Sequence, residues 1–257
     1  EISACLVGSE MCIRDSFWLE FDIRNHFKLG PVKYHNVVAS IKGTKYPDEY
    51  VIISGHLDSY DVATGGIDCG TGIGPMMEAA RMIALSGAKP KRTILFVAFA
   101  GEEFGLLGAK AYVKTHAKEL GKIANLFNRD GGPTPPVGIS VPQAMYDDFV
   151  EVCKPVKEIR ADYPFEVKVA KPFKRPTQSG GTDASVFAVE GVPTFGFNTQ
   201  DIKGYNFSYG EIWHTERDLY TKNIPEYQEH AATVTAVVAL GIANLSKQLS
   251  REGMHKK

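Results

Sequence analysis

The alternation of apolar and polar positions predicts strands early in the chain. Residues 17–27 alternate between the two classes, as a half-buried strand does. A second strand is expected over residues 37–41. A turn is expected over residues 43–49, where Gly43 and Pro47 interrupt the pattern.

Two later runs are apolar without alternation, which is typical of strands that are buried on both faces. They cover residues 50–54 and 93–100, and the second is the strongest strand pattern in the chain. Further strands are expected near residues 123–128 and 192–197.

Helical periodicity separates these strands. One amphipathic helix ends at residues 87–90 and has an apolar face made of Ile73, Met76, Met77, Ala80, Ile83 and Ala84. Further helices are expected over residues 106–120, 146–159 and 225–249. Strands that alternate with helices predict an α/β fold with three layers, in which helices cover both faces of a mixed, mostly parallel central sheet.

Composition narrows the class of protein. Hydrophobic residues make up 44% of the 257 residues and charged residues 23%, which is ordinary for a globular domain. The formal net charge of -1 gives no indication of a basic surface for nucleic acid. No apolar run approaches the roughly 20 residues that span a bilayer. We therefore expect neither a nucleic-acid partner nor a membrane span.

The head of the chain does not follow the pattern of the rest. The segment CLVGSEMCIRDS resembles translated sequencing-adapter sequence, and the alternative is a genuine but poorly patterned N-terminus. We expect residues 1–16 to be an extraneous or disordered head and residues 17–257 to form one domain. Beyond that head, Cys69 and Cys153 define no disulfide framework.

Acidic and imidazole side chains follow the predicted strands directly. His56 and Asp58 follow one strand, Glu102 and Glu103 the next, and Asp130 a third. Open α/β sheets bind ligands at the carboxyl ends of their strands. Each residue alone has an ordinary explanation as a surface or turn residue. However, two adjacent carboxylates between apolar segments would be costly to bury without a partner, and a dication is the simplest one.

Five segments in a fixed order carry a resemblance to a known family: GHLDS, GGIDCGTG, FAGEEFGLLG, NRDGG and IWHTERD. Together they resemble the co-catalytic two-zinc exopeptidases, which include bacterial leucine aminopeptidases and plasma glutamate carboxypeptidase. The segments HLDSYDV, PKRT and SGGTD favour the plasma glutamate carboxypeptidase type. The similarity covers about residues 34–246. It implies the zinc exopeptidase fold and a hydrolase that acts near the end of a peptide chain.

The resemblance also implies a set of metal ligands. His56 and Asp130 would bind one zinc ion, Glu103 and His214 would bind the other, and Asp68 would bridge the two. Imidazole nitrogen and carboxylate oxygen are ligands that zinc accepts. We therefore expect two zinc ions as the cofactors of this protein.

Three further residues would support that metal pair. The resemblance implies that the carboxylate of Asp58 hydrogen-bonds the far nitrogen of His56. Glu102 would be the general base towards a water held by the zinc pair. Cys69 stands where related enzymes often have Asp or Asn. We interpret Cys69 as a supporting residue, and the alternative is that its thiolate perturbs the metal pair.

Substrate-binding residues are expected on two loops. In related enzymes a tyrosine hydroxyl often polarises the scissile carbonyl, and Tyr205 and Tyr209 are the candidates here, with ordinary loop packing as the alternative. In the segment SGGTD, Thr182 or Asp183 would cap the helix that begins near Ala184 and would also contribute to the pocket.

The resemblance leaves the substrate open between an aminopeptidase and a dipeptidase acting on a peptide or dipeptide, and it also allows a homodimer. The alternatives are a glutaminyl-cyclase-like acyltransferase with one zinc and a receptor-like protein without metal. The complete ligand set argues against both. Relatives of this type carry more N-terminal sequence, including a protease-associated domain, and are commonly exported. We therefore expect a secreted or periplasmic parent protein from which the N-terminal portion is missing.

Overall fold

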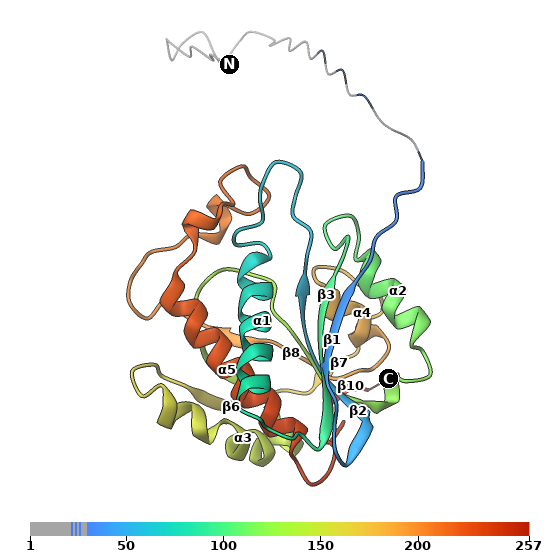
Figure 1. Cartoon of the computed structure of the whole chain (residues 1–257), viewed down its shortest axis with the longest axis vertical. Coiled ribbons are helices and arrows are strands. Elements are labelled where there is room, and N and C mark those ends of the chain that lie inside the picture. Colours follow the sequence, from blue (N-terminus) through green and yellow to red (C-terminus); the bar gives the residue numbers. More distant parts are fainter. Residues whose placement is uncertain (1–21, 23, 25, 27–29, 257) are drawn as a thin grey trace. The chain divides into compact units, whose positions relative to one another are not determined.

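A five-stranded sheet lies at the centre of the computed structural model, in the order β1-β3-β2-β4-β8 (Figure 1). Its strands are β1 (Val37–Ile41), β2 (Tyr46–His56), β3 (Arg92–Phe99), β4 (Ile123–Asn128) and β8 (Thr194–Phe195). The edge strand β1 runs antiparallel to β3, and all other neighbours are parallel. The predicted mixed and mostly parallel sheet is confirmed.

The structure describes residues 22, 24, 26 and 30–256. The head predicted over residues 1–16 lies outside the described residues, as does most of the strand predicted over residues 17–27. The compact unit that carries the fold spans Tyr34–Lys257.

Alternate side chains of the central strands enter two separate hydrophobic cores. On β2, Val51 and Ile53 point into one core and Ile52 into the other. This period of two is the geometry of a strand that is buried on both faces. It explains why the β2 and β3 segments read as continuous apolar runs.

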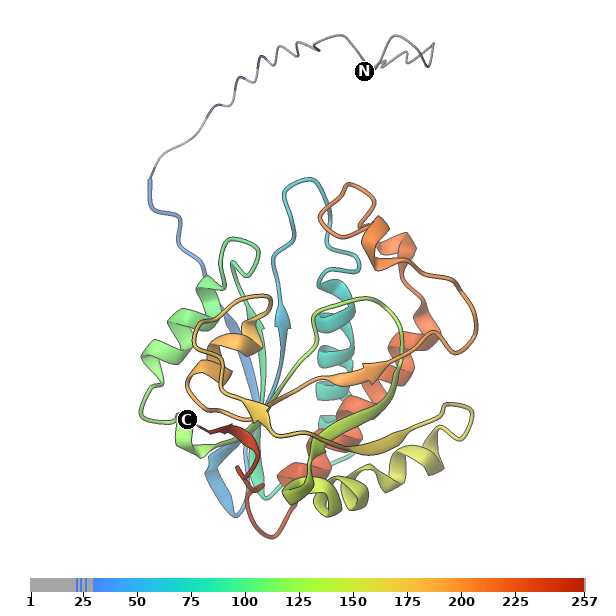
Figure 2. The same ribbon diagram turned by 180° about the vertical axis from the view of Figure 1, so that it is seen from behind.

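Helices cover both faces of the sheet, so the three-layer prediction is also confirmed (Figures 1 and 2). The first core is closed by α1 (Gly70–Leu85), α3 (Tyr146–Ile159) and α5 (Pro225–Ala243). The second core is closed by α2 (Leu107–Thr115) and α4 (Asp183–Val189). Short 3-10 helices occupy Leu120–Lys122, Gln143–Met145, Tyr209–Glu211 and Tyr220–Lys222. Among the described residues, no helix combines the length and apolar character that crossing a membrane requires.

Two small sheets were not predicted from the sequence. One has the order β6-β5-β9 and is built from β5 (Pro136–Pro142), β6 (Glu166–Ala170) and β9 (Phe197–Thr199). The other pairs β7 (Phe173–Lys174) with β10 (Met254–Lys256). The single strand expected over residues 192–197 is therefore wrong. It is divided at Gly196, and β8 joins the central sheet whereas β9 joins β5.

Three element boundaries differ from the predicted ones. The turn over residues 43–49 is shorter than expected, because β2 already begins at Tyr46 and passes Pro47 where the pairing register shifts. The helix predicted over residues 106–120 ends at Thr115. The last helix ends at Ala243 and not near residue 249, because Asn244 turns its side chain to accept the Lys91 backbone N–H at 3.1 Å.

Candidate metal centre

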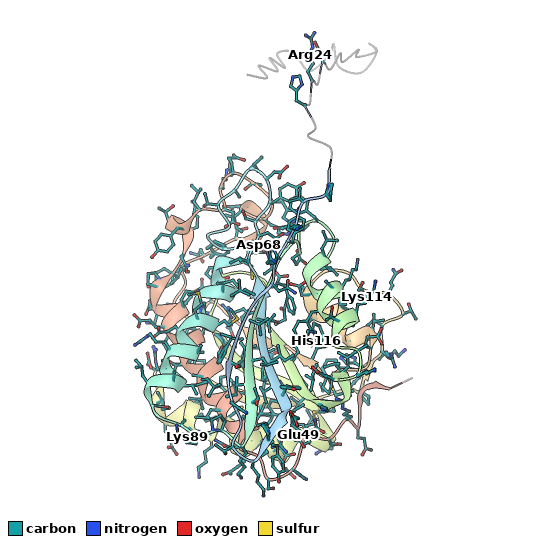
Figure 3. The ribbon with its side chains drawn as sticks, turned by 45° about the vertical axis from the view of Figure 1, so that its right-hand side comes forward. Arg24, Glu49, Asp68, Lys89, Lys114 and His116 are labelled. Atoms are coloured by element: carbon teal, nitrogen blue, oxygen red, sulfur yellow. The ribbon has the colours of Figure 1, made fainter. Side chains whose placement is uncertain are left out.

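The carboxyl ends of three neighbouring parallel strands bring the candidate ligands to one edge of the sheet. His56 is the last residue of β2, Glu103 follows β3, and Asp130 follows β4. Asp68 precedes α1, and Figure 3 shows it near the end of the sheet opposite to Glu49. This edge is where open α/β sheets bind ligands.

His56 lies at the centre of the cluster and is 2% exposed. Its Nε2 atom is 2.9 Å from Asp68 Oδ1 and 3.6 Å from Asp130 Oδ1. Burial alone would lower the pKa of His56, but the carboxylates of Asp130 and Asp68 outweigh it and raise that pKa. A cation is therefore strongly favoured at this position.

A second imidazole faces a second carboxylate in the same cavity. His214 Nε2 is 2.9 Å from Glu103 Oε2, while Glu103 Oε1 has no hydrogen-bond partner among the described residues. His214 has a left-handed backbone with φ of 57°. Its ring stacks on Tyr60 with centroids 4.3 Å apart and on Trp213 at 4.2 Å. Both stacks fix the direction of the imidazole.

The donor set fits a metal ion. Ligand atoms of His56, Asp68 and Glu103 all lie within 4.8 Å of one another. Carboxylates gathered in this way are costly to bury unless a cation is shared between them. Imidazole nitrogen and carboxylate oxygen together are ligands of zinc. Four of the five predicted ligands thus line one cavity, and the fifth, His56, contacts two of them, Asp68 and Asp130.

Cys69 lies beside the same cluster, in a second group of possible ligands with His56 and Asp130. The Asp68–Cys69 peptide bond is cis. The Cys69 thiol is buried and donates a hydrogen bond to the Arg129 carbonyl at 3.0 Å. Burial raises the pKa of this thiol. A protonated thiol that is engaged with a carbonyl supports the interpretation of Cys69 as a residue beside the metal site.

The structure corrects the role expected of Asp58. The His56 Nδ1 atom lies 3.0 Å from the Asp58 backbone carbonyl, and the nearer carboxylate oxygen is 3.8 Å away. The Asp58 carboxylate instead accepts the backbone N–H groups of Glu102 and Glu103, each at 3.1 Å. Asp58 therefore fixes the backbone that carries both glutamates, and it fixes His56 through its main chain.

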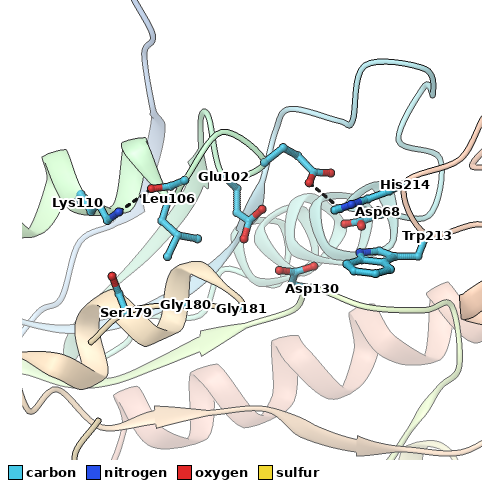
Figure 4. Close-up of a pocket in the computed structure, with 12 residues that line it drawn as sticks. Asp68, Glu102, Leu106, Lys110, Asp130, Ser179, Gly180, Gly181, Trp213 and His214 are labelled. Carbon is cyan, nitrogen blue, oxygen red and sulfur yellow. Dashed lines mark hydrogen bonds and ion pairs between the residues drawn. The ribbon is translucent and has the colours of Figure 1, made fainter. Parts of the chain in front are cut away.

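Glu102 is half-buried and lines the cavity without an ion-pair partner among the described residues (Figure 4). Burial raises the pKa of Glu102 to about 8, and the neighbouring Asp130 adds to the effect. A carboxyl group with such a pKa can both accept and release a proton near neutral pH. Burial also raises the pKa of Glu103, so what separates the two residues is the pairing of Glu103 with His214.

Asp218, which was not predicted as a site residue, holds the loop that carries Asp68. The Asp218 carboxylate is 2% exposed and accepts the backbone N–H of Ile67 at 2.6 Å and that of Asp68 at 3.2 Å. The signal was present, because Asp218 closes the segment IWHTERD that also supplies His214. The role of Asp218 could not be predicted, because its carboxylate binds backbone groups and no pattern of side chains reveals such contacts.

The two candidate tyrosines lie in different places. The Tyr209 hydroxyl donates to Asp68 Oδ2 at 2.9 Å, so it belongs to the centre. The Tyr205 hydroxyl donates to Glu226, and its ring packs on Tyr227 with centroids 5.3 Å apart. Tyr205 is thus engaged with α5 and not with the metal cluster.

The loop before α4 supplies a wall of the cavity through Ser179, Gly180 and Gly181. Thr182 occupies the N-cap position, but its side chain makes no capping hydrogen bond, so the predicted cap is wrong. The Ser185 hydroxyl fixes the loop to the helix by accepting the Gly180 N–H at 2.8 Å and donating to the Thr182 carbonyl at 2.7 Å. Asp183 is fully buried, neither of its carboxylate oxygens has a hydrogen-bond partner in the described part of the chain, and burial raises its pKa to about 7.

Comparison with known proteins places this geometry in a family. The sequence profile of "Peptidase family M28" matches residues 36–238. The chain belongs to this family. Among relatives, it is 32% identical to carboxypeptidase Q of Rattus norvegicus over 231 residues, which are 88% of this chain and 46% of the rat protein.

Solved structures of family members agree with the fold. A peptidase M28 precursor from Shewanella amazonensis SB2B superposes with a TM-score of 0.69 at 32% identity, over 84% of this chain and 46% of that one. A zinc aminopeptidase from Bacillus subtilis superposes with a TM-score of 0.62 at 21% identity, over 86% of this chain and 53% of the other, which shows the common fold. The chain spans about half the length of the relatives it matches.

Proposed function

We propose that this chain is the catalytic part of an exopeptidase that binds two zinc ions and hydrolyses a peptide bond near a chain end. The observation that carries the proposal is the cavity of about 320 Å³ in which predicted ligands of both metal sites surround an uncommitted Glu102. Membership of the M28 family supports it. When bound, the metal pair would supply Lewis-acid polarisation of the scissile carbonyl and a more acidic water.

The protein's own groups divide the remaining work. Asp58 fixes the backbone of Glu102 and Glu103, so that Glu103 can turn to His214 while Glu102 faces the cavity. Glu102 would accept a proton from the attacking water and return it to the leaving amine, which its raised pKa favours. Tyr209 and Asp218 hold Asp68 from two directions.

Metal analysis combined with a hydrolysis assay tests the proposal. Protein loaded with zinc and freed of excess metal should contain two zinc ions per chain and should hydrolyse dipeptides or aminoacyl nitroanilides. Asp68→Ala should weaken both sites together, because a bridging carboxylate serves both. A stoichiometry of one that added zinc does not change would favour the single-zinc acyltransferase. Complete loading without hydrolysis of any peptide would contradict an exopeptidase.

The setting of the whole protein is part of the same proposal. We expect the parent protein to be secreted or periplasmic, with a homodimer as an arrangement that the resemblance allows. Sequencing the complete gene tests the location, since an upstream region without an export signal would count against it. Light scattering of the purified protein tests the dimer.

A further inference from the structure

The cavity extends beyond the metal ligands to a second group of side chains. Figure 4 shows Asp68 and His214 at one side and Lys110 and Ser179 at the other, with Leu106 and Glu102 between. Lys110 belongs to α2, which begins directly after the loop that carries the two glutamates. The same segment of the chain therefore positions both the proton acceptor Glu102 and the side chain of Lys110.

The two sides of the cavity have opposite charge. Carboxylates of Asp68, Glu102, Glu103 and Asp130 line one part, whereas Lys110 is the only lysine or arginine among the described residues that line it. The Lys110 Nζ atom donates to the Gly105 carbonyl at 2.8 Å. An ammonium group has three donors, so two stay available for a ligand.

The chemistry of the proposed reaction gives the substrate a direction in this cavity. The leaving amine must face Glu102, because that residue returns the proton. Leu106 and Lys110 lie beyond Glu102 as seen from the metal ligands (Figure 4). The part of the substrate that leaves with the amine therefore runs over Leu106 towards Lys110.

We propose that Lys110 binds a carboxylate on the leaving-group side of the substrate and so selects short or acidic peptides. This inference rests on the proposed function, because the direction of the substrate follows from the role of Glu102. The carboxylate has two sources, the free C-terminus of a short peptide or an acidic side chain. Each further residue adds about 3.3–3.6 Å of extended chain, so a C-terminal carboxylate reaches Lys110 at only one peptide length.

The test compares substrates that differ in one charge, using zinc-loaded protein of the full chain. Alanyl-alanine is compared with its C-terminal amide, and alanyl-aspartate amide with alanyl-asparagine amide. The wild-type protein should favour a carboxylate in one of these pairs, with kcat/KM higher by about tenfold, the size of a charge-assisted hydrogen bond. Lys110→Met should remove that preference through KM, so that the charged and the neutral substrate of that pair are hydrolysed with equal kcat/KM.

A matched control and a peptide series identify the source. Lys114→Met, one turn further along α2 and outside this cavity, should change neither pair. Preference for the free acid, with a maximum at one length among di-, tri- and tetrapeptides, assigns the C-terminus. Preference in the aspartate pair assigns an acidic side chain.

The outcomes separate this inference from the proposed function. Equal hydrolysis within both pairs, with no response to Lys110→Met, overturns the inference and leaves the exopeptidase standing. Absence of all hydrolysis overturns the proposed function. In that case calorimetry tests the inference through binding affinity. The ligands are a phosphinic dipeptide analogue, its amide, and its aspartate and asparagine counterparts. Binding that favours a carboxylate and loses this preference in Lys110→Met supports it, and equal binding overturns it.

Discussion

At the amino end of the central sheet, the buried Arg92 donates to Glu49 at 2.6 Å and to the Leu245 carbonyl at 2.7 Å, while its guanidinium covers the Tyr46 ring at 4.9 Å. At the carboxyl end, His56 is equally buried, but it stands among several carboxylates. Glu103 Oε1 there has no hydrogen-bond partner among the described residues. Charged groups are buried at both ends. In the part of the chain that the structure describes, Arg92 at the amino end has its hydrogen-bond partners, whereas Glu103 at the carboxyl end does not have all of them.

The difference separates a structural ion pair from a binding site. Unpaired buried carboxylate oxygens cost free energy, so a fold retains them where a ligand completes them. Arg92 has partners from β2 and from the segment after α5, and it needs nothing further. The same comparison predicts that mutations at the carboxyl end change chemistry, whereas mutations at the amino end change stability.

The largest effect is expected at Glu102. Glu102→Gln keeps the shape of the side chain and removes the base, so kcat should fall by about 10²–10⁴-fold. The zinc content should stay at the wild-type level, as measured by elemental analysis beside steady-state kinetics. Glu103→Gln is the control on the adjacent residue and should weaken zinc binding instead. Loss of zinc in Glu102→Gln, with near-normal turnover when zinc is resupplied, would mean that the two roles are reversed.

The amino end should respond in the opposite way. Arg92→Met leaves Glu49 and the Leu245 carbonyl without their partner, and we expect the free energy of unfolding to fall by roughly 3 kcal/mol. Urea denaturation measures it, and kcat of the folded fraction should be unchanged. Arg81→Met breaks the exposed pair with Glu78 and should change stability little. A stable Arg92→Met variant with a lowered kcat would contradict the assignment of stability to the amino end and of chemistry to the carboxyl end.

His230 is a buried histidine away from the metal centre, and its surroundings differ from those of His56. His230 is fully buried, stacks on Tyr163 with centroids 4.0 Å apart, and places Nε2 2.8 Å from the Pro136 carbonyl. Burial lowers the pKa of His230 to about 4, and the hydrogen bond to the Pro136 carbonyl and the charge of Asp162 offset only part of that effect. The unfolded chain therefore binds the proton more readily than the folded one, and stability is complete above pH 6.5 and is lost as pH falls towards 4.

The lowered pKa of His230 predicts a measurable dependence of the free energy of unfolding on pH. As pH falls from 7 to 5, the lowered pKa of His230 should reduce the free energy of unfolding by about 2 kcal/mol, measured in metal-free protein. His230→Phe keeps a ring against Tyr163 and should flatten that part of the profile. His116→Phe is the matched control, because His116 also stacks on a tyrosine and contacts a backbone carbonyl but is only half-buried. An identical slope in wild type and His230→Phe would contradict the assignment.

The sequence predicted the parts of the fold that periodicity encodes. The apolar runs of β2 and β3 gave the central sheet, and the face of Met76 and Ile83 gave α1, because both patterns follow from burial. The small sheets escaped prediction for a physical reason. Strand β6 is mostly exposed, and β7 has only two residues, so neither leaves a period that can be read.

The candidate site also has a part that the sequence predicted and a part that it did not. His56, Glu103 and Asp130 were predictable as a cluster because they follow buried strands, whereas Asp68 and His214 were expected only from the family resemblance. The contacts that orient them were not, because they join side chains to backbone groups. Asp58 accepts two backbone N–H groups, and Asp218 accepts two more on the loop of Asp68. Long-range partners of this kind depend on the folded chain and not on local sequence.

The smallest effect is expected at Asp58, and it decides between the two roles given to that residue. In Asp58→Asn the amide can still accept one backbone N–H but not both, since its nitrogen is a donor. The loop of Glu102 should therefore loosen, and kcat should fall by about tenfold, as for the loss of one charge-assisted hydrogen bond. His56 keeps the backbone carbonyl as its partner, so zinc affinity should stay within a few-fold of wild type. A fall in zinc affinity of about 10–100-fold, which is typical when the partner of a ligating histidine is lost, would instead restore the carboxylate as the group that orients His56.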